Sequence, residues 1–367
     1  MAGAPPTGAP PTGAPVLHRR TGVEVELLAP RGSSRRHLAD ELARRCGGSV
    51  RPVFHTDSEA SAAPGVQRFW HLTPGFEVLD AAGAPLCRLV DDTTIVRDLD
   101  AAAPAVPGWY RVLSDDARLL RLVAAHADPA AGIASVLDPA AALFGARAVA
   151  VGGAFRLDDA AGATVALAAP LPGERERPCE VVTPPLERDH LAALEALLAP
   201  ARALGFTVPA EAAVHLHLDA APFRDVAALR AVVRLFGPWG AGLRHLLGTN
   251  PACRRLGPLP PELVELAERD WASWEDLRAA TAGTGVSKYR DVNLTGVLGV
   301  RPGPPTLEVR VLPGALHGRE VVRRAALVEA LLERFHRGGP LPPVPADPAA
   351  AADALRALAG PVPPPGR

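Results

Sequence analysis

Ionisable residues occupy every second position in three short stretches of the chain. They are Glu24 with Glu26, then His215 with His217 and Asp219, and finally Glu308 with Arg310. Successive side chains of a β-strand point to opposite faces, so each stretch would place its ionisable groups on one face and its aliphatic residues on the other. Glutamates and histidines that meet on one face form the ligand set of a divalent metal ion, so the pattern predicts an enzyme.

Glu24 and Glu26 alone are a weak signal, because alternating glutamates on an exposed strand usually stay solvated. Like charges on one strand face repel, and a divalent cation is the usual reason to hold several together. His215, His217 and Asp219 are a stronger signal. Imidazole suits zinc, manganese, iron and copper, whereas carboxylates favour magnesium and manganese. The mixed set is best matched by Mg²⁺ or Mn²⁺ bound with phosphate; the alternative is a group of polar residues at a solvated strand end.

Further acidic residues lie next to apolar runs. Glu180 belongs to an apolar, strand-like segment that ends at two prolines. A carboxylate buried there without a cation costs several kcal/mol or takes up a proton, so Glu180 favours a metal ion. Asp91 and Asp92 form an acidic step between aliphatic runs, which fits either a ligand or a turn.

Two basic residues are candidates for handling phosphate. Arg310 either forms a strand-surface ion pair with Glu308 or neutralises a phosphoryl group while Glu308 holds a metal ion. Lys288 is the only lysine among 39 basic residues. It is either a chance survivor on a loop or a compact ammonium that the planar fork of arginine could not replace.

The sequence lacks the common phosphate-binding loops. It contains no GxxxxGK[ST] segment, and Gly240-Ala241-Gly242 continues to His245 and not to a third glycine. A GxSxG nucleophile motif is missing too. If a nucleotide binds, a metal-lined sheet must therefore hold its phosphates.

Strands and helices must position these residues. Patterns of period two predict strands at 22–28, 66–72, 75–80, 85–90, 93–98, 178–183, 213–219, 290–295 and 305–312, with hairpin turns at 80–83 and 158–162. Helical periodicity predicts helices at 34–46, 115–126, 188–204, 225–247 with a break at Gly237-Pro238, 261–281 and 319–336. Because the strands and helices do not alternate strictly, the pattern indicates an α+β fold with a largely antiparallel sheet.

Composition limits the class of protein. With 367 residues, 48% of them hydrophobic, the chain can bury a large core. A net charge of −1 gives no global field for nucleic acid, and no apolar run reaches a membrane-spanning length, so we expect a cytoplasmic protein without nucleic-acid or membrane partners. The four cysteines are widely spaced, which favours free thiols. Residues 1–16 and 338–367 are rich in proline, so we predict two tails, the second with a helix at 346–359, around a domain at 17–337.

Taken together and in order, the motifs resemble the amidoligase family of the carboxylate-amine ligase superfamily, which includes glutamine synthetase and glutamate-cysteine ligase. The segments that carry the resemblance are Gly22–Glu26, Asp91–Thr94, Glu180–Leu186, His215–Asp219, Lys288–Leu294 and Leu307–Arg310. The likeness spans about residues 20–337. Thr183 stands where the family commonly has serine, and residues 99–175 have no recognisable counterpart.

The resemblance implies a glutamine synthetase-like fold, in which a curved antiparallel sheet has helices packed on its convex face. It implies an ATP-dependent ligase that forms an amide or peptide-like bond through an acyl phosphate. The substrates would be a small-molecule or peptide carboxylate and an amine, and an oligomer is compatible with the resemblance. The implied Mg²⁺ or Mn²⁺ ligands are Glu24, Glu26, Glu180, His215 and Glu308; the implied nucleotide-binding residues are His217, Lys288, Asn293 and Arg310; and the implied catalytic residues are Arg310, Lys288 and Asp92.

Two other classes of protein fit parts of the pattern. A metal-dependent hydrolase or oxygenase could use His215, His217 and a carboxylate to hold Zn²⁺ or Fe²⁺. A non-catalytic family member could bind a peptide partner. The complete ligand set makes the non-catalytic member the weakest of the three interpretations.

Overall fold

The chain folds into two compact units, each of which contains strands and helices. The computed structural model describes residues 16–56, 68–300 and 305–360. The N-terminal unit comprises Glu24–Pro184 and Ala199–Ala212, and the C-terminal unit comprises Met1–Val23, Pro185–Leu198 and Ala213–Arg367. Across the described ranges, no helix is both long and apolar enough to cross a membrane.

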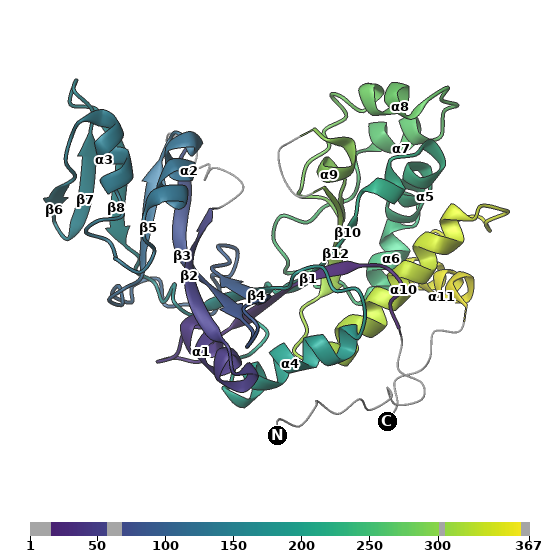
Figure 1. Ribbon diagram of the computed structural model, residues 1–367. Coiled ribbons are helices and arrows are strands. Elements are labelled where there is room, and N and C mark those ends of the chain that lie inside the picture. The colour runs from purple at the N-terminus through teal and green to yellow at the C-terminus, as the bar shows by residue number, and fades with distance from the viewer. Residues whose placement is uncertain (1–15, 57–67, 301–304, 361–367) are drawn as a thin grey trace. The chain divides into compact units, whose positions relative to one another are not determined.

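The sheet of the N-terminal unit is built from antiparallel pairs of strands. Its strands are β1 (Thr21–Leu28, of which Glu24 onward belongs to this unit), β2 (Ser49–Thr56), β3 (Trp70–Leu79), β4 (Pro85–Val90), β5 (Tyr110–Ser114), β6 (Val149–Val151), β7 (Ala154–Asp158), β8 (Thr164–Pro170) and β9 (Pro178–Val182). One arm runs from β3 through β4 and β9 to β1, and a second arm runs from β3 through β5, β8 and β7 to β6 (Figure 1). Both arms start from the long strand β3.

Helix α1 (Arg35–Cys46) covers one face of the first arm. Ser34 and His37 form a capping box at its start, and Gly47 ends it in the left-handed conformation with φ 65°. The helix buries Leu38 and Leu42 against the sheet. Gly48 then passes so close to β3 that a Cβ atom would lie 1.8 Å from the Leu79 carbonyl oxygen, so only glycine fits there.

The second arm has a core of its own. Helices α2 (Ala117–His126) and α3 (Asp138–Phe144) bury Leu120, Val123 and Leu137 together with Val112 of β5 and Leu157 of β7. Figure 1 shows both helices beside these strands. Helix α3 lies in the alanine-rich stretch where the sequence pattern predicts no element.

The C-terminal unit surrounds a short antiparallel sheet with helices. Its strands are β10 (Ala213–Asp219), β11 (Val292–Asn293) and β12 (Thr306–Pro313), with β12 paired to both others. Its helices are α5 (Val226–Phe236), α6 (Gly240–Leu247), α7 (Pro261–Ala267), α8 (Trp274–Ala280), α9 (Thr295–Leu298), α10 (Gly318–His336) and α11 (Pro348–Ala359), and α4 (His190–Ala203) begins in this unit.

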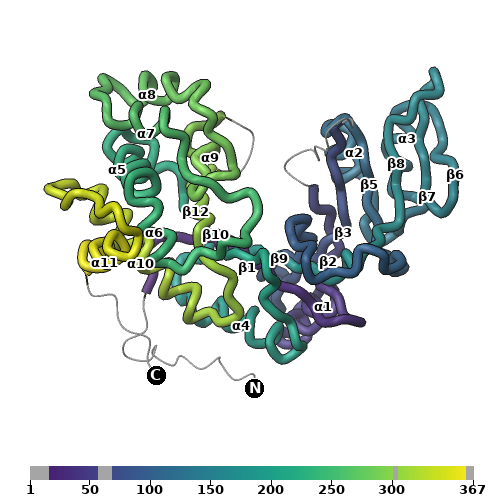
Figure 2. Tube along the Cα trace, turned by 180° about the vertical axis from the view of Figure 1, so that it is seen from behind, coloured from purple at the N-terminus to yellow at the C-terminus, as the bar shows by residue number. Residues whose placement is uncertain are grey.

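The helix predicted at 346–359 exists as α11 and packs on α6 and α10 (Figures 1 and 2). A Cβ atom on Gly242 would lie 2.6 Å from the Cβ of Ala351, so the two helices approach closely. The predicted break at Gly237-Pro238 is confirmed, because it separates α5 from α6.

Three local predictions are wrong. The predicted strands 66–72 and 75–80 are one strand, β3, although 66 and 67 lie outside the described residues. Residues 93–98 form turns, because the Asp92 carboxylate accepts hydrogen bonds from both the backbone N–H and the hydroxyl of Thr94. The predicted helix 261–281 is two helices, since Ser273 caps a new start at α8. The class of fold, helices with an antiparallel sheet, is confirmed.

Candidate functional site

Glu24, Glu26 and Glu180 lie on one face of the N-terminal sheet. In the antiparallel pair of β1 and β9, Glu26 is directly opposite Glu180, and Glu24 is opposite Val182. Directly opposed residues share a face, so the three carboxylates project the same way. Val25, Leu27, Cys179 and Val181 project to the other face and are buried. The alternation predicted from the sequence is therefore present.

Negative charge accumulates around Glu180. Burial raises the pKa of Glu180 well above its ordinary value, and the nearby carboxylates of Glu24, Asp92 and Glu26 raise it further, as does a hydrogen bond with Glu24. Asp92 lies in the turn after β4 and is itself buried. We call Glu24, Glu26, Asp92 and Glu180 the carboxylate group. These residues offer hard oxygen donors, and a divalent cation would remove their mutual repulsion.

The predicted residues of the C-terminal unit meet on β10 and β12. His217 is directly opposite Glu308, and the Nδ1 atom of His215 lies 3.7 Å from Oε1 of Glu308. His217 Nδ1 lies 3.2 Å from the hydroxyl of Thr306. His215 and Glu308 are both buried, so these groups meet away from bulk water.

Glu308 accepts hydrogen bonds from two further predicted residues. Asn293 of β11 donates from Nδ2 to Oε2 of Glu308 over 2.7 Å, and Arg310 donates from Nη1 to Oε1. The Asn293 amide is oriented by Thr295, whose N–H and hydroxyl both donate to Oδ1. Glu308 and Arg310 thus form the ion pair that the sequence allowed. We call His215, His217, Asn293, Glu308 and Arg310 the histidine group.

Lys288 lies in the loop before β11. Its ammonium is 5.3 Å from the ring centroid of Tyr289, and the guanidinium of Arg255 is 5.4 Å from the same ring. Two cations therefore share one aromatic ring, a favourable cation–π arrangement.

The four cysteines are free thiols, as predicted.

Asp91 holds the loop beside the carboxylate group in place. Its Oδ1 accepts a hydrogen bond from Arg175 over 2.5 Å and lies 4.0 Å from the fully buried Arg35. Arg35 also donates to the backbone carbonyls of Pro74, Arg175 and Pro178. The Asp91–Asp92 step is therefore a turn with a buried ion pair. No local sequence signal marks Arg35, because its partners are far away along the chain.

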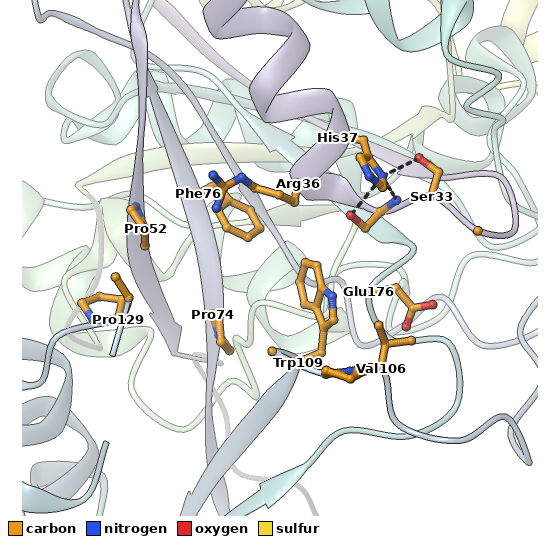
Figure 3. Close-up of a pocket in the computed structure, with 15 residues that line it drawn as sticks. Ser33, Arg36, His37, Pro52, Pro74, Phe76, Val106, Trp109, Pro129 and Glu176 are labelled. Carbon is orange, nitrogen blue, oxygen red and sulfur yellow. Dashed lines mark hydrogen bonds between the residues drawn. The ribbon is translucent and has the colours of Figure 1, made fainter. Parts of the chain in front are cut away.

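A cavity of about 520 Å³ lies on the helix-covered face of the same unit. Figure 3 shows Phe76, Trp109 and three of the prolines on its walls, with Glu176 at one side. Phe76 is opposite Leu89, which is opposite Val181, so these residues project away from the face that carries Glu180. No sequence signal predicts the cavity, since Trp109 lies in the stretch 99–175, which has no recognised counterpart in the family.

Helices and antiparallel strands thus hold a sheet face on which carboxylates gather. Residues 17–332 match the sequence model of the family described as "Putative amidoligase enzyme", so the chain belongs to that family, as its ordered motifs predicted. No curated protein matches the chain. Membership of this family implies an enzyme with ligase activity.

Proposed function

We propose that the chain is an ATP-dependent carboxylate-amine ligase that forms an amide or peptide-like bond through an acyl phosphate. The observation that carries the proposal is the carboxylate group. Three glutamates on one sheet face and Asp92 beside them keep the pKa of Glu180 raised, chiefly through burial and then through their charges. Such repulsion costs stability unless a bound cation compensates for it.

The proposed ligands fit Mg²⁺, or Mn²⁺ in its place. Mg²⁺ prefers carboxylate oxygens and retains part of its coordination for substrate phosphates. Glu24, Glu26 and Glu180 would supply carboxylates from one unit, and His215 and Glu308 would supply ligands from the other. Bound Mg²⁺ would neutralise charge on the phosphates of ATP and on the transferred phosphoryl group.

The remaining residues would position the reactants. Arg310, which forms an ion pair with Glu308, would provide a permanent positive charge for the transferred phosphate, and Lys288 would provide a second. His217 and Asn293 would contact the nucleotide, and Asn293 also fixes the orientation of Glu308. Asp92 would orient the ammonium of the amine substrate and accept its proton before the amine displaces phosphate.

The proposal includes a glutamine synthetase-type fold. Its support is the division of the N-terminal sheet into one face with carboxylates and one face covered by α1. Under the proposal, the carboxylate group and the histidine group each contribute to ATP binding. Variants in either group should therefore weaken ATP binding, and a group whose variants leave nucleotide affinity unchanged would be removed from the proposal.

The test uses the purified protein with Mg²⁺, ATP and pooled amino acids, peptides and amines. We expect phosphate release that depends on both an amine and a carboxylate. Isothermal titration with a non-hydrolysable ATP analogue, with and without Mg²⁺, measures the binding step separately. Absence of nucleotide binding at millimolar concentration, together with zinc or iron retained through purification, would instead favour the metal-dependent hydrolase or oxygenase.

A further inference from the structure

The edge of β3 is shared by two strands, which leaves a fork between them. β4 pairs with Phe76–Leu79 and β5 pairs with Trp70–Leu72. β2 pairs with Leu72–Leu79 on the other edge, so β4 and β5 lie on the same edge of β3. Within the described sheet, residues 73–75 pair with neither β4 nor β5, and the buried Arg35 donates to the Pro74 carbonyl oxygen over 3.2 Å.

Arg111 projects from this fork on the face that carries Glu180. His71 is opposite Leu113, so Arg111, two residues before Leu113 on β5, shares the face of His71. Glu77, on the same face of β3 as His71, is opposite Arg88, and Arg88 is opposite Val182. Val182 and Glu180 alternate onto that face of β9, so Arg111 and the carboxylate group lie on one side of the sheet.

The register also gives the separation of Arg111 from Glu180. Val90 is opposite Glu180 on β9, and the pairing of Leu89 with Phe76 places Val90 level with Gly75 of β3. The last pair of β3 with β5 is Leu72 with Val112, and Arg111 is the next residue of β5 towards the fork. With β5 extended in this register, one strand spacing and two residues, roughly 9 Å, would separate the two backbones. A short molecule could contact both side chains.

Arg111 differs from the nearby arginines in its ion-pair and hydrogen-bond partners. Arg51 and Arg88 pair with Glu77, and Arg175 donates to Asp91 and to two backbone carbonyls. Among residues 16–56, 68–300 and 305–360, Arg111 has no ion pair and no hydrogen bond from its side chain. Its side chain is only partly exposed, and its Nε is covered without a partner in the same part of the chain.

Burial and a neighbouring positive charge make the charged form of Arg111 unfavourable unless an anion binds. Burial lowers the pKa of Arg111, and the positive charge of Arg175 lowers it further, yet a guanidinium stays charged in proteins. Burial and the charge of Arg111 likewise lower the pKa of His71. A half-buried guanidinium without a carboxylate is costly, and a bidentate anion would satisfy it.

We propose that Arg111 binds a second acidic group of the carboxylate substrate, so that the substrate class is short dicarboxylates. The inference rests on the proposed function, because one carboxylate would be activated at the carboxylate group while Arg111 holds the other. A bidentate pair with a planar guanidinium fixes the orientation of the substrate as well as its position. Arg111 is thus a specificity-determining residue.

The first experiment measures binding without ATP. Succinate, glutarate and adipate are titrated into the full chain, with butyrate and valerate as monocarboxylate controls. We expect at least one dicarboxylate to bind about tenfold or more tightly than the monocarboxylates, the effect of one charge-assisted contact. Arg111→Gln should remove this preference, and Arg111→Lys should restore part of it. Arg88→Gln, on the same sheet face, is the matched control and should leave the preference unchanged.

The second experiment measures turnover with hydroxylamine as the amine. Transfer of the terminal phosphoryl group of ATP to the probe would give an acyl phosphate and ADP. Hydroxylamine would then displace phosphate from the acyl phosphate to give a hydroxamate, which a colorimetric assay detects. Arg111→Gln should raise KM for the dicarboxylate and leave KM for ATP unchanged. An Arg111-dependent preference without hydroxamate would sink the proposed ligase reaction alone.

Three results would overturn the inference about Arg111. The first is that the unaltered protein binds no dicarboxylate more tightly than the monocarboxylates. The second is that Arg111→Gln keeps the preference for dicarboxylates unchanged. The third is that Arg111→Gln keeps this preference but no longer binds ATP. The last would assign Arg111 to a phosphate of the nucleotide. Circular dichroism melting checks that each variant is folded, and Arg111→Lys keeps the test valid if Arg111→Gln does not fold.

Discussion

Glu77 and Glu180 lie on the same face of the same sheet, but the protein treats their charges in opposite ways. Glu77 accepts hydrogen bonds from Arg51 and Arg88. Burial alone raises its pKa, but these bonds lower it below its ordinary value overall. Around Glu180, burial raises the pKa and the neighbouring charges are carboxylates, so nothing among these main influences opposes the shift.

Burial and sheet position do not distinguish Glu77, which the fold pairs with arginines, from Glu180, a proposed metal ligand. The difference lies in the neighbours that shift the pKa of each carboxyl group. They are Arg51 and Arg88 at Glu77, and other carboxylates at Glu180. Glu308 combines both features, because Arg310 and Asn293 bind its oxygens while His215 lies within 3.7 Å.

The largest expected effect separates Glu180 from Glu77 by activity. Glu180→Gln should lower phosphate release by about a thousandfold, since a lost metal ligand removes several kcal/mol of charge stabilisation. Glu77→Gln should retain the activity of each folded molecule. A steady-state phosphate assay at saturating Mg²⁺ and ATP, normalised to folded protein, decides the question. Equal turnover by the two variants would remove Glu180 from the site.

A smaller effect is expected at Glu308, whose charge is already partly compensated. Glu308→Gln should lower phosphate release by about a hundredfold and weaken Mg²⁺-dependent nucleotide binding. The fold should survive, because glutamine can still accept a hydrogen bond from Asn293. Unchanged turnover with the same melting temperature would mean that Glu308 belongs with Glu77, as a structural partner of Arg310.

Replacement of Asn293 tests whether the orientation of Glu308 matters when Arg310 already balances its charge. Asn293→Ala removes the hydrogen bond to Glu308 but no charge. Loss of such an orienting contact typically costs ten- to a hundredfold in metal affinity or activity, and we expect about tenfold. Titration of activity with Mg²⁺ should show the loss as a weaker apparent metal affinity. An effect on kcat alone, with unchanged metal affinity, would contradict this role.

The two glutamates should also differ in how they affect stability. Glu77→Gln should destabilise the protein by about 1–2 kcal/mol, a value reduced for solvent screening because Arg51 and Arg88 are largely exposed. Since the folded-state pKa of Glu77 is lowered, its contribution is present above the unfolded pKa of about 4.3 and is lost as pH falls through the folded pKa. Urea unfolding at pH 7 and at acid pH measures both values.

The smallest expected effect is a gain in stability when Glu180 is replaced in the metal-free protein. Its folded-state pKa is raised, so it costs no stability below about pH 4.3 and costs progressively more as pH rises through the folded pKa. Glu180→Gln should therefore raise the melting temperature in EDTA at neutral pH by about 2–4 °C for each kcal/mol of repulsion removed. Mg²⁺ should raise the melting temperature of the unaltered protein but not that of Glu180→Gln, so that the unaltered protein becomes the more stable of the two. A lower melting temperature for the variant in EDTA would refute the charge argument.

Sequence periodicity predicted the parts of the fold that depend on neighbouring residues. The alternation of Glu24 with Glu26, and of His215 with His217, follows from the period of two of a β-strand. Helix α1 followed equally well from its cap at Ser34 and Gly47. Such signals lie within a few residues, where a single sequence is informative.

The features that were missed depend on residues that are distant in sequence. β2 was not predicted, because Pro52 interrupts its alternating pattern. Its partner strand, β3, begins only at Trp70, so no short hairpin turn marks the pairing. The burial of Arg35 depends on Asp91 and on the carbonyl of Arg175, 140 residues later. The position of Arg111 follows only from the fork in β3. Local periodicity cannot encode these pairings, so only the folded structure reveals them.

The chain order of the two units governs how the protein can be made. The C-terminal unit contains residues before Glu24 as well as residues after Ala213, and the His18 N–H bonds to the Glu329 carboxylate, 311 positions later. During synthesis the N-terminal unit can fold once Ala212 has left the ribosome, but His18 must wait for its partner Glu329 on α10. No single cut therefore yields both units whole, and a library of truncations should contain soluble fragments only for the N-terminal unit.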